Sequence, residues 1–221
     1  MVALALKPSA HQLPSFRSCV HTSDDERRMM FIGFAERFEL RHGLDRKQFV
    51  ATIGARLGRT PGMAYHWLSK AKRNRAIPWS MLDLLHYEEV MMERGIEFGY
   101  DMLSLYQPHA KMIPSEASTI HTSDEERRVM FTDFIHRFEA RHDLVRRQSV
   151  TSIAIRMCRT PPMIYHWMSS TKRTRAIPWP MMDLLIYEER LLENGISLGH
   201  NILSLYENTG RLTNSYDLEP A

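Results

Sequence analysis

Basic and aromatic side chains that can contact a nucleic acid occur in two matching stretches of the chain. Each stretch reads Arg-Thr-Pro, then Tyr-His-Trp, then Lys-Arg-x-Arg-Ala-Ile-Pro-Trp, and they cover Arg59–Trp79 and Arg159–Trp179. Arg and Lys side chains bind phosphates, while Tyr and His can donate or accept hydrogen bonds at base edges. The residue types therefore favour phosphate and base recognition as the chemistry of these stretches.

The two stretches lie in the most basic parts of the chain, and an acidic part follows each of them. Residues 41–75 contain nine Lys or Arg and one acidic residue, and residues 141–175 contain eight Lys or Arg and one acidic residue. Residues 76–106 contain six acids and one Arg, and residues 176–206 contain four acids and one Arg. A basic patch of this kind is typical of phosphate binding. A solvated basic face balanced by acids within the fold would have the same composition, and charge alone does not separate the two interpretations.

Both stretches belong to an internal repeat with a step of 100 residues. Residues 21–106 and 121–206 align without a gap and are identical at 51 of 86 positions. Such a period indicates two copies of one folding unit. We therefore predict an N-terminal tail, a first unit, a semi-extended linker, a second unit and a C-terminal tail, at residues 1–20, 21–106, 107–118, 119–207 and 208–221.

The hydrophobic pattern predicts an all-α fold with about five helices in each unit. No run of β-branched residues alternates with polar ones, and turn signals separate the helical segments. Ser23 with Glu26, and Ser123 with Glu126, have the spacing of a capping box. In the first unit we expect five helices, at about residues 23–43, 45–57, 61–71, 77–95 and 96–106.

Each unit has apolar residues at the spacing of one helical face. The phenylalanines of residues 31–38 and 131–138 recur at i, i+3 and i+7, which predicts a stripe facing the core. We expect Trp67 and Trp167 to be core residues, with Met63 and Ala64 also turned inward. Trp79 and Trp179 are predicted to anchor the start of the helix that follows each basic loop.

Residues 49–69 resemble a helix-turn-helix of the lambda-repressor/Cro-like class. That class has a small residue where its two helices touch, at which this chain has Gly54 and Ala154. Four positions later it has a turn residue, usually glycine, at which this chain has Gly58 and Cys158. Cys158 departs from the pattern, and this departure predicts a distorted turn in the second unit.

The resemblance implies that the helix beginning at Pro61 is a recognition helix whose N-terminal part enters the major groove of DNA. The Lys and Arg residues that flank the helix would contact phosphates. Arg59 and Arg159 depart from the pattern of the class, which more commonly has an apolar residue at this position of the turn. The residues expected at bases or phosphates in the first unit are Arg59, Thr60, Pro61, Gly62, Tyr65, His66, Ser69, Lys70, Lys72, Arg73 and Arg75. Those in the second unit are Arg159, Thr160, Pro161, Pro162, Tyr165, His166, Ser169, Ser170, Lys172, Arg173 and Arg175. Neither helix has Arg, Asn or Gln on this face, so base specificity is expected to be modest or shared with neighbouring loops.

We therefore predict sequence-specific binding of double-stranded DNA by two tandem units that act as a covalent pseudo-dimer on a two-part operator. Half-sites for paired motifs of this kind lie about 34 Å apart, and the linker would set the effective concentration of the second unit. The resemblance favours a transcriptional regulator, and a repressor in particular. The sequence leaves association into a homodimer open.

Two other functions fit the same sequence. The units could dock on a protein such as a polymerase or another regulator, through the acidic fourth and fifth helices with their apolar residues Met91, Met92, Ile96, Phe98, Leu103 and Leu105. The basic loop beside Tyr65 and His66 could instead bind RNA. Substituting Arg73 and Arg173 by Glu would impair DNA binding but not protein docking.

The residues do not predict an enzyme, because the chain has no glycine-rich phosphate loop, nucleophile elbow or convincing catalytic cluster. Glu88 and Glu89, repeated at 188 and 189, are expected on a solvated acidic face. The two cysteines predict neither a disulfide nor a metal site, and we expect no cofactor. No apolar run approaches about 18 residues, so we expect a cytoplasmic protein without a membrane partner, nucleoid-associated if the source is bacterial or phage.

Overall fold

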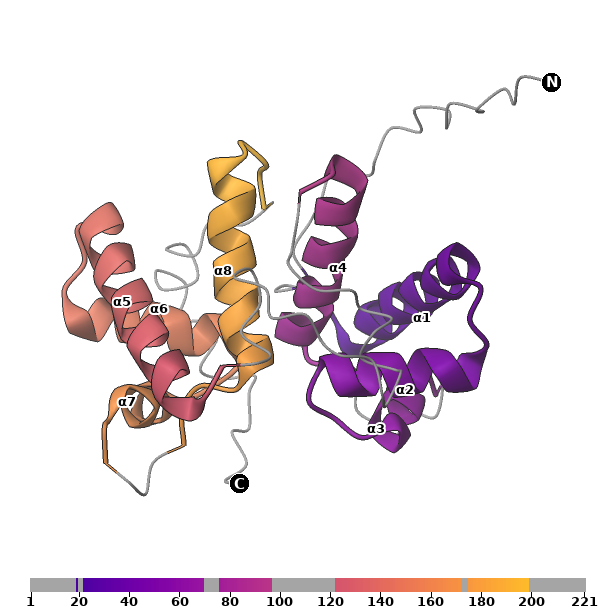
Figure 1. Ribbon diagram of the computed structural model, residues 1–221, viewed down its shortest axis with the longest axis horizontal. Coiled ribbons are helices and arrows are strands. Elements are labelled where there is room, and N and C mark those ends of the chain that lie inside the picture. Colours follow the sequence, from indigo (N-terminus) through magenta and orange to yellow (C-terminus); the bar gives the residue numbers. More distant parts are fainter. Residues whose placement is uncertain (1–18, 20–21, 70–75, 97–121, 172–174, 199–221) are drawn as a thin grey trace.

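All regular structure in the described part of the chain is helical, which confirms the predicted fold class. The structure is a computed structural model and describes residues 19, 22–69, 76–96, 122–171 and 175–198. The helices are, in chain order, α1 (Asp24–His42), α2 (Arg46–Arg56), α3 (Pro61–Leu68), α4 (Trp79–Arg94), α5 (Asp124–His142), α6 (Arg146–Arg156), α7 (Pro161–Met168) and α8 (Trp179–Glu193) (Figure 1). Among these residues, no helix combines the length and apolar character needed to cross a membrane.

The helix ends form where the sequence places capping residues. Ser23 accepts a hydrogen bond from the Glu26 amide while Glu26 accepts one from the Ser23 amide, and Ser123 and Glu126 do the same, so both predicted capping boxes are confirmed. Asp45 caps α2 in the first unit, whereas Val145 replaces it without a side-chain cap in the second. Despite this difference, each unit has four helices at equivalent positions and in the same order.

The third helix predicted for the first unit is too long, and its counterpart in the second unit ends at the equivalent residue. It was expected to reach Ala71, but α3 ends at Leu68 and α7 at Met168. Ser69 and Ser169 have extended backbone, with ψ of 132° and 130°, and an extended residue cannot continue the helical hydrogen-bond ladder. The expected fifth helices, the linker and most of both tails lie outside the described residues.

Aromatic side chains fill the core of each unit, as the phenylalanine stripe predicts. The ring centroids of Phe31 and Phe34 lie 6.0 and 6.3 Å from that of Phe49 on α2. The ring centroids of Trp67 on α3 and Phe31 lie 5.9 Å apart in an edge-to-face arrangement, and those of Trp167 and Phe131 lie 6.0 Å apart in the same arrangement. Such edge-to-face pairs add stability beyond the burial of apolar area, and they fix α3 and α7 against the longer helices.

The two sets of helices meet through α4 and α8, which lie side by side at the centre of the molecule (Figure 1). The contact is reciprocal. Arg56 on α2 pairs with Glu88 on its own α4 and, at 3.2 Å, with Asp183 on α8. Arg156 on α6 pairs with Glu188 on its own α8 and, at 3.1 Å, with Asp83 on α4.

These arginines are fully buried and still charged. Burial alone would lower the pKa of Arg56, but the negative charges of Glu88 and Asp183 outweigh burial and raise that pKa. Tyr87 adds a further bond, since its hydroxyl donates to Glu188 at 2.9 Å and accepts from the Arg156 Nη2 at 3.0 Å. Each guanidinium therefore has acidic partners in both units.

The prediction that Glu88 and Glu89 form a solvated acidic face is wrong. Glu88 is buried and holds Arg56, and Glu89 is 8% exposed and accepts two hydrogen bonds from Arg37, at 2.9 and 2.7 Å. Their charges are neutralised by arginines from helices distant in sequence, which no periodicity within one helix can show. Glu188 is also buried and holds Arg156.

Trp79 and Trp179 do more than anchor a helix start. The Arg156 guanidinium carbon lies 5.0 Å from the centre of the Trp79 ring, and that of Arg56 lies 5.0 Å from the Trp179 ring. Each tryptophan is thus placed over the arginine of the other unit, at a distance where cation–π attraction is effective.

Replacing Arg56 with Met should lower the free energy of unfolding by about 3–5 kcal/mol, because Glu88 and Asp183 would lose their buried cation. Urea unfolding followed by tryptophan fluorescence measures this change. Arg147→Met is the matched control on exposed α6 surface, and its effect should stay within about 0.5 kcal/mol. Equal unfolding free energies for the two variants would contradict the role given to Arg56.

Candidate nucleic-acid interface

The short helices α3 and α7 each bury one side and expose the other. Ala64 and Trp67 of α3 are buried, and so are Ile164 and Trp167 of α7. Tyr65 and Tyr165 are 46% and 47% exposed. The adjacent His66 and His166 are also exposed. The same Tyr-His pair is therefore turned to solvent in both units, because the neighbouring Trp is held in the core.

The surroundings of this pair differ between the units. Thr60, Pro61 and Gly62 are exposed at the start of α3, and the Thr60 hydroxyl accepts a hydrogen bond from the Met63 amide. In the second unit Thr160 and Pro161 are half-buried, and Pro162 is exposed.

The ends of the two short helices offer fewer exposed groups. Ser69 and Ser169 are half-buried, and the Ser169 carbonyl accepts a hydrogen bond from Arg128. Ser170 and Arg175 are exposed. The remaining predicted contacts, Lys70, Lys72, Arg73, Arg75, Lys172 and Arg173, lie outside the described residues.

Met63 was predicted to face the core and does not, and its counterpart Met163 is exposed as well. Their side chains are 43% and 38% exposed, beside the Tyr-His pair of the same helix. An eight-residue helix has room for few inward positions, and Ala64 with Trp67 (or Ile164 with Trp167) takes them. The helical period places position 63 next to 66 and 67, so the sequence alone leaves its direction ambiguous.

The turn that leads into each short helix has the same backbone in both units. Gly58 has φ of 60° and Cys158 has φ of 52°, both in the left-handed region. The amide of Arg59 donates to the Gly54 carbonyl at 2.7 Å, and that of Arg159 donates to the Ala154 carbonyl at 2.8 Å. The predicted distortion at Cys158 is therefore wrong. The cysteine adopts a conformation that costs a non-glycine residue about 1–2 kcal/mol, and the surrounding contacts maintain it.

The position of Gly54, where α2 meets the turn, has room only for a small residue. A Cβ atom at this position would lie 3.0 Å from the Arg59 carbonyl oxygen and 3.1 Å from the Pro61 nitrogen. These neighbours are backbone atoms and cannot move aside as a flexible side chain would. This close approach agrees with the small residue expected from the sequence at the helix contact.

The turn of the first unit also lies against the second unit. A Cβ atom on Gly58 would lie 3.7 Å from Pro180 and 3.9 Å from the Trp179 Nε1, both at the start of α8. Arg59 follows this glycine, and its pKa is lowered by burial and by the positive charge of Arg159. The two arginines that precede α3 and α7 thus lie close enough to repel each other, and a bound anion would relieve that repulsion.

The basic part of the first unit is less available than its composition suggests. Arg41 pairs with Glu93 at 3.1 Å, Arg46 pairs with Glu39, and Arg56 is in the buried network. Lys47 and Arg59 are exposed, and neither forms a salt bridge with an acidic residue in the described part of the chain. The charge count along the sequence therefore overstates the cationic surface of the described residues.

Comparison with known proteins gives no match. No protein-family model, curated protein or solved structure is similar to this chain at a significant level.

Substitutions on the buried and exposed sides of α3 are expected to differ strongly in their effect on stability. Trp67→Ala should lower the free energy of unfolding by about 3–5 kcal/mol, because it removes a buried ring from the core. Tyr65→Ala, on the exposed side, should change it by no more than about 0.5 kcal/mol. Chemical denaturation of both variants checks this, and a large loss for Tyr65→Ala would show that its ring supports the fold.

Proposed function

We propose that the chain binds double-stranded DNA through α3 and α7, as two helix-turn-helix units joined into one pseudo-dimer. The observation that carries the proposal is the repeated exposure of a Tyr-His pair on a short helix whose Trp is buried. A helix of eight residues is about 12 Å long, and the major groove is about 12 Å wide. Tyr65, His66 and their counterparts would then face base edges, and exposed Met63 and Met163 would offer apolar contact to a thymine methyl group.

The reciprocal packing of α4 and α8 supports binding to a two-part site. The packed contact between the units would hold both short helices in one arrangement before DNA arrives, which would lower the entropy lost on binding. The arginines at 59 and 159 lie near this contact and are suited to phosphates between the half-sites. The unequal residues Gly62 and Pro162 on the two helices favour unequal half-sites.

The role proposed for such a protein is transcriptional regulation, with repression as the first hypothesis. Occupation of a promoter by a compact protein is sufficient for repression, whereas activation needs a further contact with the transcription machinery. The alternative, docking on a protein through acidic helices, has less support because Glu88 and Glu89 are bound to arginines within the chain.

Selection from a random pool of DNA duplexes, followed by a salt titration, tests the proposal. We expect a recovered motif in two parts and an affinity that falls steeply as salt rises, since each phosphate contact releases a counterion. Absence of binding at low salt would overturn DNA recognition. Salt-dependent binding without a motif would overturn sequence specificity.

Substitutions in one unit at a time show whether both short helices read DNA. Tyr65→Ala with His66→Ala, and separately Tyr165→Ala with His166→Ala, should each weaken binding to the selected duplex by about 10–100-fold, the loss of one or two base contacts. All four substitutions together should leave only weak, non-specific binding. Leu40→Ala, at an 87% exposed position on α1, is the control and should bind as the unaltered chain does. Unaltered affinity in the fourfold variant would refute recognition through α3 and α7.

A further inference from the structure

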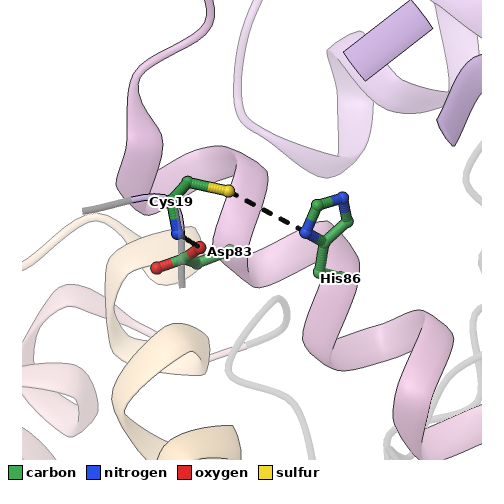
Figure 2. A group of neighbouring side chains, drawn as sticks. All are labelled: Cys19, Asp83 and His86. Carbon is green, nitrogen blue, oxygen red and sulfur yellow. Dashed lines mark hydrogen bonds between the residues drawn. The ribbon is translucent and has the colours of Figure 1, made fainter. Parts of the chain in front are cut away.

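Three side chains of metal-binding types meet beside α4, in the first unit. Cys19 lies before α1, and Asp83 and His86 belong to α4 (Figure 2). The Cys19 Sγ is 3.9 Å from the His86 Nδ1, and one ligand atom from each of the three residues lies within 4.8 Å of the others. Cys19 and Asp83 are buried and His86 is half-buried, so the group has limited contact with solvent.

The arrangement is held by local geometry and by a direct hydrogen bond. Asp83 and His86 are three residues apart on one helix, so their side chains project from neighbouring positions on its surface. The Cys19 amide donates to the Asp83 Oδ1 at 2.8 Å, which places the cysteine against α4 although 64 residues separate the two in sequence. The Thr22 amide in turn donates to the Cys19 carbonyl at 3.1 Å and shapes the backbone around it.

The separations suit a small cation between these groups. Zinc binds sulfur at about 2.3 Å and histidine nitrogen at about 2.0 Å, so tetrahedral ligands of these types lie about 3.5 Å apart. The 3.9 Å between Cys19 and His86 requires an adjustment of only a few tenths of an ångström. Met30, whose Sδ lies 4.0 Å from the Cys19 Sγ, adds a polarisable thioether beside the thiol.

Metal binding would convert the Cys19 thiol to a thiolate. The thiol proton would be released to solvent as the metal–sulfur bond forms, and the divalent cation would supply the positive charge that a thiolate needs beside the Asp83 carboxylate.

The second unit shows that the repeated fold does not need this group of residues. It keeps Asp183, but Thr119 and Ile186 stand where the first unit has Cys19 and His86. Asp183 pairs across the unit contact with Arg56, as Asp83 does with Arg156. The shared aspartate is explained by that contact, whereas the cysteine and histidine of the first unit are not.

We propose that Cys19, Asp83 and His86 form a binding site for a thiophilic divalent cation of the zinc class. The three side chains would supply sulfur, oxygen and nitrogen, and a solvent molecule would complete a tetrahedral shell. The site is separate from the α3 and α7 surfaces and does not depend on DNA binding.

Titration of the metal-free full chain with Co²⁺ tests the site, since cobalt replaces zinc and reports thiolate bonding by a charge-transfer band. We expect one Co²⁺ per chain, with this band, and its displacement by one equivalent of Zn²⁺. Cys19→Thr and His86→Ile introduce the residues of the second unit and should weaken Co²⁺ binding by at least about tenfold, the loss seen even when a supporting residue is removed. Cys158→Ser retains the proposed site and should bind Co²⁺ as the unaltered chain does.

Circular dichroism and thermal unfolding of the metal-free proteins show whether each variant remains folded. If a variant fails to fold, alkylation of the unaltered chain provides a second measurement, because Zn²⁺ should protect Cys19 but not Cys158. Absence of stoichiometric binding in the unaltered chain would overturn the proposal. So would retention of the charge-transfer band in Cys19→Thr or its loss in Cys158→Ser.

Discussion

Two buried arginines determine how this protein is assembled. Arg56 and Arg156 are each enclosed by an acid of their own unit and an acid of the other, and each faces a tryptophan across the contact. A charge removed from water is costly unless it is closely paired. Separating α4 from α8 would expose or unpair these groups, so the charge requirement links the cores of both units into a single structure.

This constraint extends from the core to the surface. The same helices that carry the arginines, α2 and α6, lead directly into the turns before α3 and α7, and Gly58 in the first turn rests against Trp179 and Pro180. The placement of the exposed Tyr-His pairs therefore depends on the contact between the units. A ligand with two parts would meet two surfaces already fixed relative to one another, which is the physical advantage of a duplicated chain over two separate proteins.

The repeated units are similar without being equivalent. Cys158 takes the left-handed backbone that Gly58 adopts without strain, and Val145 stands where Asp45 caps a helix. Cys19 and His86 accompany Asp83 in the first unit, whereas the second unit has Thr119 and Ile186 at the equivalent positions. Both units keep the buried arginines and their acidic partners, and the differences fall at other positions.

The sequence by itself determined the helical fold class, most helix boundaries, the phenylalanine core and the exposure of Tyr65 and His66, because caps and helical periodicity act between close neighbours. It did not reveal the burial of Glu88, the left-handed conformation of Cys158, the exposure of Met63 or the approach of Cys19 to α4. The burial of Glu88 and the approach of Cys19 to α4 depend on partners far along the chain, Arg56 at 32 residues and Asp83 at 64 residues. Only the tertiary structure brings such residues together, since the pairing energy of a charge or thiol depends on spatial neighbours rather than on sequence spacing.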